Sequence, residues 1–207
     1  MTTSSAVPIV LGSASPRRLE LLERAGLSVE VSPSDVDETT LPGESAREYT
    51  LRVATDKAHH CARTHDGAIV VAADTTVAID DQILTKPTGP IDAAAMLRML
   101  SGRSHEVMTA VVVIDPGGIE HSLLAIATVT FLTLSDSLID WYVGTGEPLD
   151  KAGAYGLQGA GEVLVERGRD FRRRLLACPS ALPSTSSGPL APPGHSELCD
   201  NSGLCDN

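Results

Sequence analysis

The chain has 207 residues, of which 42% are hydrophobic, 21% are charged and only 3% are aromatic. This length can bury a sizeable core in one domain or two small ones, and the apolar fraction excludes a wholly disordered chain. No uninterrupted apolar run approaches the ~20 residues that a membrane span needs. The first residues also lack a basic region followed by a long apolar run. We therefore expect a cytoplasmic protein, neither secreted nor embedded in a membrane.

The net charge at pH 7 is −11, from 16 Lys and Arg residues against 27 Asp and Glu residues. A nucleic-acid polymer is therefore a poor partner, because binding one needs a broad basic surface. A small anionic substrate is compatible with this balance, since a few basic side chains can converge locally on an acidic protein.

The composition changes near residue 166. Residues 1–166 hold apolar runs that alternate with amphipathic stretches, which is typical of a folded domain. Residues 167–207 begin with an arginine-rich stretch and continue with many prolines, serines and glycines. Such a segment cannot bury enough apolar area to offset its ordering entropy, so we expect an atypical and largely disordered tail.

The first predicted elements surround a turn of small residues. Pro8–Leu11 is a short apolar run that predicts a strand, and it leads into the sequence GSASP. Ser15 is a suitable N-cap and Pro16 a favoured first helical residue, so a helix is expected to follow and to end at Gly26. Val29 and Val31 then alternate with polar residues, as in a strand.

A second helix and a long strand come next. Ser45 and Glu48 have the spacing of a capping box, which predicts a helix that runs through Ala58. An almost continuous apolar run over 69–79 predicts a buried strand that ends in an Asp-Asp turn.

The remaining predicted elements alternate in type. Asp92 and Ser135 stand where N-caps are expected. The predicted helices cover 93–100 and 135–144, and the predicted strands cover 107–114, 123–134 and 162–166. Interleaved strands and helices favour an α/β fold, and the long strand pair after residue 105 favours a mixed sheet over a purely parallel one.

The turn at residues 12–18, GSASPRR, is the first candidate binding site. A strand that enters a capped helix through small residues points free N–H groups and the positive end of the helix dipole at one spot, where an anion is stabilised. Ser13 lies in this turn, and Arg17 and Arg18 follow at the start of the helix, where they could bond phosphate. The alternative is an ordinary capped helix with two solvated arginines.

Carboxylates supply the second candidate. Asp74 interrupts the apolar run, where an unpartnered carboxylate would be costly, and strand ends gather the sites of α/β sheets. It could bind a metal or act as a general base, or it could simply cap a turn. Glu38 lies in an acidic segment, SDVDE, for which the alternative is a solvated loop.

Gln158 and two lysines complete the candidates. Gln158 stands in a glycine-rich stretch over 147–159, and its amide could pair with a base through one donor and one acceptor. The alternative is a simple glycine-rich connection. Lys57 and Lys86 are the remaining basic candidates, although each alone is typical of a surface lysine.

Together these segments resemble the Maf family of septum-formation-type nucleotide pyrophosphatases. The resemblance covers roughly residues 8 to 166, and from Arg167 onward the sequence departs from the family pattern of a further strand and a closing helix. The matching stretches, in family order, are GSASPRRLELLERAG (12–26), the Asp37-Glu38 loop, Lys57-Ala58, AADTTV (72–77), Lys86-Pro87, MLRMLSGRSHEVMTAV (96–111) and GEPLDKAGAYGLQGAG (146–161).

The resemblance implies a fold and a reaction. The fold is an elongated mixed β-sheet flanked by helices with a central cleft, of the Maf/ITPase-like kind. The reaction cleaves a nucleoside triphosphate between its α and β phosphates, and the sequence is most similar to the dTTP/UTP branch. By the same resemblance Asp74 is the proton acceptor, and Arg17, Thr75 and Gln158 set the base preference.

The chemistry of the residues agrees with this reaction. A triphosphate carries about four negative charges, so its site needs basic groups and a divalent cation, Mg²⁺ or Mn²⁺. Asp74 and Glu38 are the expected oxygen ligands of that metal, and the expected cations are Arg17, Arg18, Lys57 and Lys86. A homodimer is compatible with this reading. The alternatives are a nucleotide-binding regulator of cell division without significant turnover, and a 7-methyl-GTP pyrophosphatase.

Overall fold

The computed structural model describes residues 7–166. The predictions made for the tail over 167–207 lie outside the described residues.

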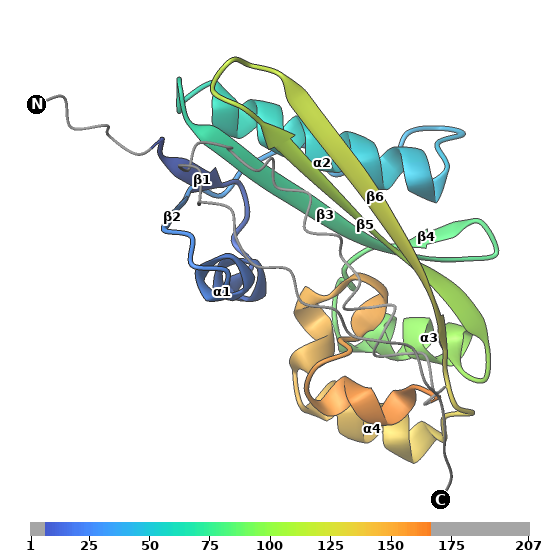
Figure 1. Ribbon diagram of the computed structural model, residues 1–207. Helices are drawn as coiled ribbons and strands as arrows, with labels where there is room; N and C mark the ends of the chain where they lie inside the picture. The colour runs from blue at the N-terminus through green and yellow to red at the C-terminus, as the bar shows by residue number, and fades with distance from the viewer. Residues whose placement is uncertain (1–6, 167–207) are drawn as a thin grey trace, which may run out of the picture.

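A six-stranded mixed sheet forms the centre of the molecule (Figure 1). The strands run in the order β2-β1-β3-β5-β6, and β4 pairs with β3 outside this path. Strand β1 is parallel to β2 and β3, whereas β3, β5 and β6 pair antiparallel. The strands are β1 (Ile9–Leu11), β2 (Val29–Val31), β3 (Ile69–Ile79), β4 (Gln82–Leu84), β5 (Ser104–Ile114) and β6 (Glu120–Thr130). The predicted α/β fold with a mixed sheet is thus confirmed.

Strand β3 has a gap in its pairing on one side. Strand β1 pairs only with residues 69–71 of β3, and β4 pairs only with residues 77–79. Between these pairings, residues 72–76 have a described strand neighbour on the β5 side alone. The carboxyl end of β1 therefore opens beside the middle of β3, and this is where ligands bind in open α/β sheets.

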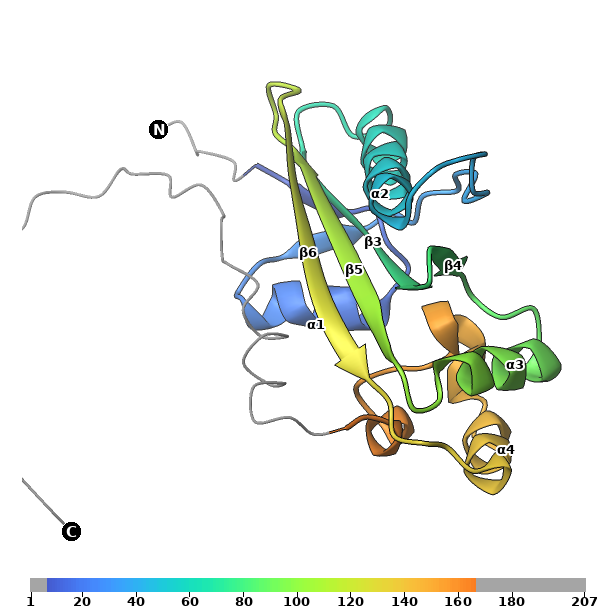
Figure 2. The same cartoon turned by 90° about the vertical axis from the view of Figure 1, so that its right-hand side faces the viewer.

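Helices lie on both faces of the sheet. Figure 2 shows α1 on one face of the long strands and α2 on the other. The helices are α1 (Pro16–Arg24), α2 (Ala46–Ala62), α3 (Pro90–Leu100) and α4 (Asp136–Gly144), followed by the short 3₁₀ helices η1 (Glu147–Asp150), η2 (Ala152–Ala154) and η3 (Ala160–Leu164). Within residues 7–166 no helix has the length and apolar character to cross a membrane.

Two separate hydrophobic cores hold the elements together. In the first, residues of α2 such as Ala54 and Ala58 pack on β1, β3 and β5. In the second, Leu97 of α3 and Tyr142 of α4 pack with the η helices and the far ends of the long strands. The long strands run from one core to the other (Figure 2), so a ligand bound midway along β3 contacts a frame that both cores support.

The predicted caps are confirmed at α2 and α4. Ser45 and Glu48 form a complete capping box, and the Ser135 side chain accepts from the Leu138 N–H. Ser15 is the N-cap of α1 as predicted, although its side chain makes no capping hydrogen bond. These capping patterns predict where a helix begins because they depend only on residues three positions apart.

Three predictions about the second half need correction. Asp92 is not the N-cap of α3, because the helix begins at Pro90 and Asp92 instead accepts from the N–H and hydroxyl of Thr88. The predicted strand over 162–166 is mostly the 3₁₀ helix η3, and only Val165 forms a β-bridge. The last long strand covers 120–130, not 123–134, and the short strand β4 was not predicted.

Candidate active site

Asp74 lies in the middle of β3, and not at a strand end as the sequence predicts. It occupies the unpaired stretch beside the end of β1, so the open edge arises where β1 stops and not where β3 stops. The residue is 8% exposed. Its Oδ1 accepts from the Lys57 ammonium at 2.8 Å, and its Oδ2 accepts from the Thr76 hydroxyl at 3.2 Å. Both oxygens thus have a donor, which offsets the cost of burying a carboxylate.

Lys57 joins Asp74 to Glu38. Its Nζ lies 2.8 Å from an oxygen of each carboxylate. Lys57 comes from α2, whose buried face positions it over β3, and its side chain is only 11% exposed. The three side chains therefore form one ionic cluster.

The loop that carries Glu38 is fixed to α2 by contacts that sequence reasoning missed. The Tyr49 hydroxyl donates to the Glu38 carbonyl oxygen at 2.9 Å, and the Ser34 hydroxyl donates to the Lys57 carbonyl at 2.9 Å. Burial raises the pKa of Tyr49 to about 12, with Asp74 and Glu38 adding to the shift, so the phenol keeps the proton that it donates. The sequence shows Tyr49 only as an aromatic residue on the buried face of a capped helix. That pattern is equally typical of a residue that simply packs in the core.

Arg18 approaches β3 from the opposite face of the sheet. Its guanidinium donates to the Ser13 hydroxyl at 2.9 Å, to the Ala73 carbonyl at 2.7 Å and to the Thr75 hydroxyl at 3.2 Å. Burial lowers the pKa of Arg18 from its usual value while Asp74 and Glu38 oppose that shift, and a guanidinium stays charged in either case. Arg18 thus braces the unpaired edge and places a positive charge there.

Arg17 differs from Arg18 in its surroundings. Its side chain is exposed, and it makes no hydrogen bond or salt bridge to residues 7–166. Of the two arginines that are adjacent in sequence, only Arg18 is fixed at the β3 edge by hydrogen bonds.

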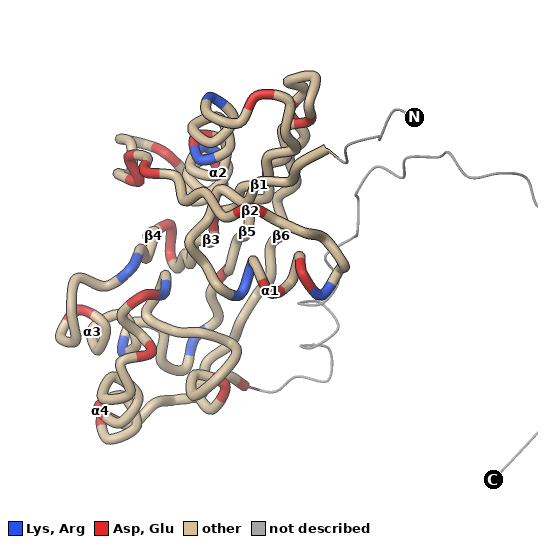
Figure 3. Tube along the Cα trace, turned by 90° about the vertical axis from the view of Figure 1, so that its left-hand side faces the viewer, with Lys and Arg blue, Asp and Glu red and all other residues tan. Residues whose placement is uncertain are grey.

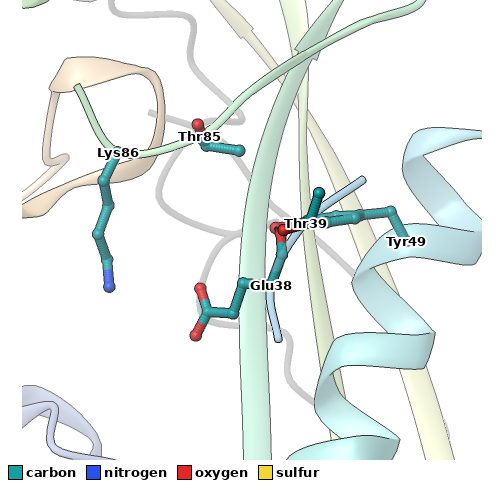
Figure 4. A pocket seen from close by; sticks show the side chains of 5 residues that line it. All are labelled: Glu38, Thr39, Tyr49, Thr85 and Lys86. Carbon is teal, nitrogen blue, oxygen red and sulfur yellow. Dashed lines mark hydrogen bonds between the residues drawn. The ribbon is translucent and has the colours of Figure 1, made fainter. Parts of the chain in front are cut away.

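A pocket of about 320 Å³ opens beside the ionic cluster. It is lined by Glu38, Thr39, Tyr49, Thr85 and Lys86. Figure 4 shows the Lys86 ammonium and the Glu38 carboxylate extending into the same open space from opposite sides. Lys86 therefore adds a cation across the pocket from the cluster.

Gln158 stands apart from this cluster. It is exposed on the loop between η2 and η3, and within residues 7–166 it makes no hydrogen bond. Beneath this loop lie Tyr142 and Glu147, which sequence reasoning did not single out.

Two carboxylates could contribute ligands to a divalent cation, beside the lysine that joins them. One oxygen of Glu38 and one of Asp74 lie 2.8 Å from Lys57 Nζ, so the ammonium fills the point between them and a divalent cation would use their other oxygens. A Mg²⁺ ion is usually held by one or two carboxylates, and it takes its other ligands from water and substrate phosphates. Residues 7–166 contain no group of three or more His, Cys, Asp or Glu side chains that could hold a metal ion, so such a cation would depend on those additional ligands.

Charged positions of both signs lie along α1 and around β4. Figure 3 shows basic and acidic positions interspersed along the chain in this region. Such a pattern matches a small charged ligand better than a long acidic polymer.

The chain is similar to proteins of known function. A dTTP/UTP pyrophosphatase from Anaeromyxobacter dehalogenans strain 2CP-1 is 49% identical over 84% of this chain and 89% of its own length. A dTTP/UTP pyrophosphatase from Myxococcus xanthus is 50% identical over 76% of this chain and 79% of its own. Among solved structures, a HAM1 protein from Coxiella burnetii matches over 76% of this chain and 91% of its own, with 15% identity and a TM-score of 0.45. The model of the family described as Maf-like protein matches residues 8–171, and the chain therefore belongs to the Maf family.

Proposed function

We propose that this protein is a nucleoside triphosphate pyrophosphatase that hydrolyses dTTP and UTP to the monophosphate and diphosphate. The observation that carries the proposal is the ionic cluster at the unpaired edge of β3, where Asp74, Lys57 and Glu38 meet. The dTTP/UTP pyrophosphatases that are about half identical to this chain support the same reaction.

The charge of the site suits a triphosphate. Arg18, Lys57 and Lys86 surround the two carboxylates, and Arg17 adds a further positive charge at the start of α1. A triphosphate carries about four negative charges, so it also needs a divalent cation to be held next to Asp74 and Glu38. Glu38 and Asp74 are the residues that would hold Mg²⁺ or Mn²⁺, which would neutralise phosphate charge when bound.

Asp74 is the group that accepts the proton of the attacking water. The water oxygen bonds to phosphorus, the bridge between the α and β phosphates breaks, and the proton passes to Asp74. Lys57 and Thr76 fix the two oxygens of this carboxylate, so its orientation exists before substrate arrives. Arg18 and Lys86 stabilise negative charge on the phosphates.

Base preference belongs to the other side of the site. Arg17, Thr75 and Gln158 are the residues proposed to set it. The Thr75 hydroxyl contacts Arg18 and lies 3.2 Å from the Thr109 hydroxyl, so Thr75 contributes by fixing Arg18 as well as by direct contact.

A substrate panel tests the proposal. The full chain is incubated with dTTP, UTP, CTP, GTP and 7-methyl-GTP in the presence of Mg²⁺ or Mn²⁺, and the diphosphate released is measured after its conversion to phosphate. We expect dTTP and UTP to be cleaved fastest. Nucleotide binding without diphosphate release would instead support a binding regulator, and a preference for 7-methyl-GTP would support the sibling activity.

A further inference from the structure

The loop that carries Gln158 is tied at its start to α4. The Tyr142 hydroxyl accepts from the Gly156 N–H at 3.2 Å, and it donates to Glu147 Oε1 at 3.0 Å. Tyr142 itself is fully buried in the second core. The first residue of the loop over 156–161 is therefore held by a side chain that cannot move without disturbing that core.

The end of the same loop is tied to η1. Glu147 Oε2 accepts from the Ala160 N–H at 2.9 Å, and Oε1 accepts from the Gly161 N–H at 3.4 Å. With the Tyr142 hydroxyl, three donors converge on one carboxylate. Hydrogen bonds to an ionised acceptor are stronger than bonds between neutral groups, so Glu147 is the main anchor of the loop.

The glycines of the loop allow this close approach. A Cβ at Gly159 would lie 2.8 Å from Glu147 Oε2, and a Cβ at Gly161 would lie 2.3 Å from the Gly156 carbonyl oxygen and 2.7 Å from the Tyr142 hydroxyl. Gly159 also has a φ of +97°, which L side chains rarely adopt. The glycine spacing thus serves the fit of the backbone around Glu147 and Tyr142, with Gln158 left exposed between the two anchored ends.

We propose that Glu147 and Tyr142 are positioning residues for base recognition: they hold the loop over 156–161 so that the Gln158 amide is presented in one orientation. The inference rests on the proposed function, because it concerns how that site distinguishes one nucleotide from another. A fixed amide discriminates between bases because a mismatched base leaves its donor or acceptor unpaired.

The anchoring is tested first without any nucleotide. Amide hydrogen exchange is measured on the full chain for the wild type, Glu147→Ala, Tyr142→Phe and Asp140→Asn. Asp140 is an exposed carboxylate on the neighbouring α4 and serves as the matched control. Loss of one hydrogen bond corresponds to about tenfold faster exchange, which we expect over 156–161 in the first two variants only. Unchanged exchange in both would overturn the anchoring.

Specificity is the second readout. We expect Glu147→Ala to lower the ratio of kcat/KM for UTP over CTP by about tenfold, toward the ratio of Gln158→Ala, with little further loss in the double variant. Glu147→Gln keeps one oxygen acceptor and should restore part of the ratio. Tyr142→Phe keeps the ring in the core and tests the same loop if Glu147→Ala folds poorly.

The outcomes separate the two proposals. An equal loss for every nucleotide, with the ratio unchanged, would show a merely structural role and overturn the positioning inference while leaving the pyrophosphatase intact. A wild type that cleaves no nucleotide would overturn the proposed function and with it base recognition, and the exchange experiment would still report whether Glu147 anchors the loop.

Discussion

The two sides of the site are built by different means. On the α2 side, Lys57, Asp74 and Glu38 form an ionic cluster whose members come from a helix, a strand and a loop. On the α4 side, one carboxylate, that of Glu147, binds backbone N–H groups of a glycine-rich loop. In the proposed site, the first side would present charge to the ligand, whereas the second uses its charge internally and would present a neutral amide. This division suits a substrate whose phosphates are common to all nucleotides and whose base is not.

The largest expected effect comes from breaking the ionic side. Lys57→Met removes the cation that bridges Asp74 and Glu38, and it should lower kcat/KM for dTTP on the order of 100-fold, because charge stabilisation at phosphate is lost. Arg47→Met removes a cation from an exposed position on the same helix and should leave the rate nearly unchanged. If the Lys57 variant were as active as the wild type, Lys57 would have no role in the reaction.

A change on the α4 side should lower the stability of the fold. Gly153 in η2 has a φ of +66°, and a Cβ there would lie 2.9 Å from Val77 Cβ. We expect Gly153→Ala to lower the free energy of unfolding by about 2 kcal/mol, from backbone strain and overpacking together. Gly144→Ala is the control, since a Cβ at Gly144 meets nothing within 4 Å. Urea unfolding measures both, and equal stability of the two variants would refute the strain.

A pH dependence of stability should arise from His105 in the hydrophobic core. Burial lowers the pKa of His105 to about 4 from its ordinary 6.5, and its Nε2 lies 2.7 Å from the Tyr155 hydroxyl. The unfolded chain therefore binds the extra proton first as the pH falls. The contribution of His105 to the free energy of unfolding is fully present above pH 6.5. It falls by on the order of 3 kcal/mol as the pH is lowered to 4.

His105→Gln keeps a polar partner for Tyr155 but does not titrate. Its stability, measured by urea unfolding at several values between pH 7 and pH 4, should therefore fall less than that of the wild type. Parallel curves for the two proteins would show that His105 does not titrate differently on folding.

The smallest expected effect concerns the loop of Glu38. Tyr49→Phe removes the hydroxyl that donates to the Glu38 carbonyl. We expect a change of about threefold to tenfold in the Mg²⁺ concentration needed for half-maximal rate, because one neutral hydrogen bond is lost. The rate at saturating Mg²⁺ should stay near that of the wild type, and a large loss there would give Tyr49 a more direct role.

The sequence predicted the elements near the ionic side well, because their signals are local. Capping residues lie within one turn of the helices they begin, and the run over 69–79 is long enough to predict β3 without any tertiary information. The open edge beside Asp74 was not predictable in the same way. It depends on where β1 stops pairing with β3, and that is set by residues about 60 positions away in the chain.

The α4 side, with its glycine-rich loop, was harder to predict. The resemblance placed Gln158 in the site, but the sequence alone did not show that Glu147 lies beneath the same loop, since its three donors come from two separate segments. The 3₁₀ helix η3 was read as a strand because its apolar residues have no distinct period over five positions. Different roles for Arg17 and Arg18 also required coordinates, because neighbours on a helix face different directions.

The most direct test of the account compares turnover and binding in Asp74→Asn. Diphosphate release from dTTP and the dissociation constant for dTTP are measured in parallel on this variant and on the wild type, with Mg²⁺ present. The account predicts a turnover on the order of 100-fold lower with dTTP binding changed only slightly, because the amide cannot accept the proton. A variant that releases diphosphate as fast as the wild type would contradict it.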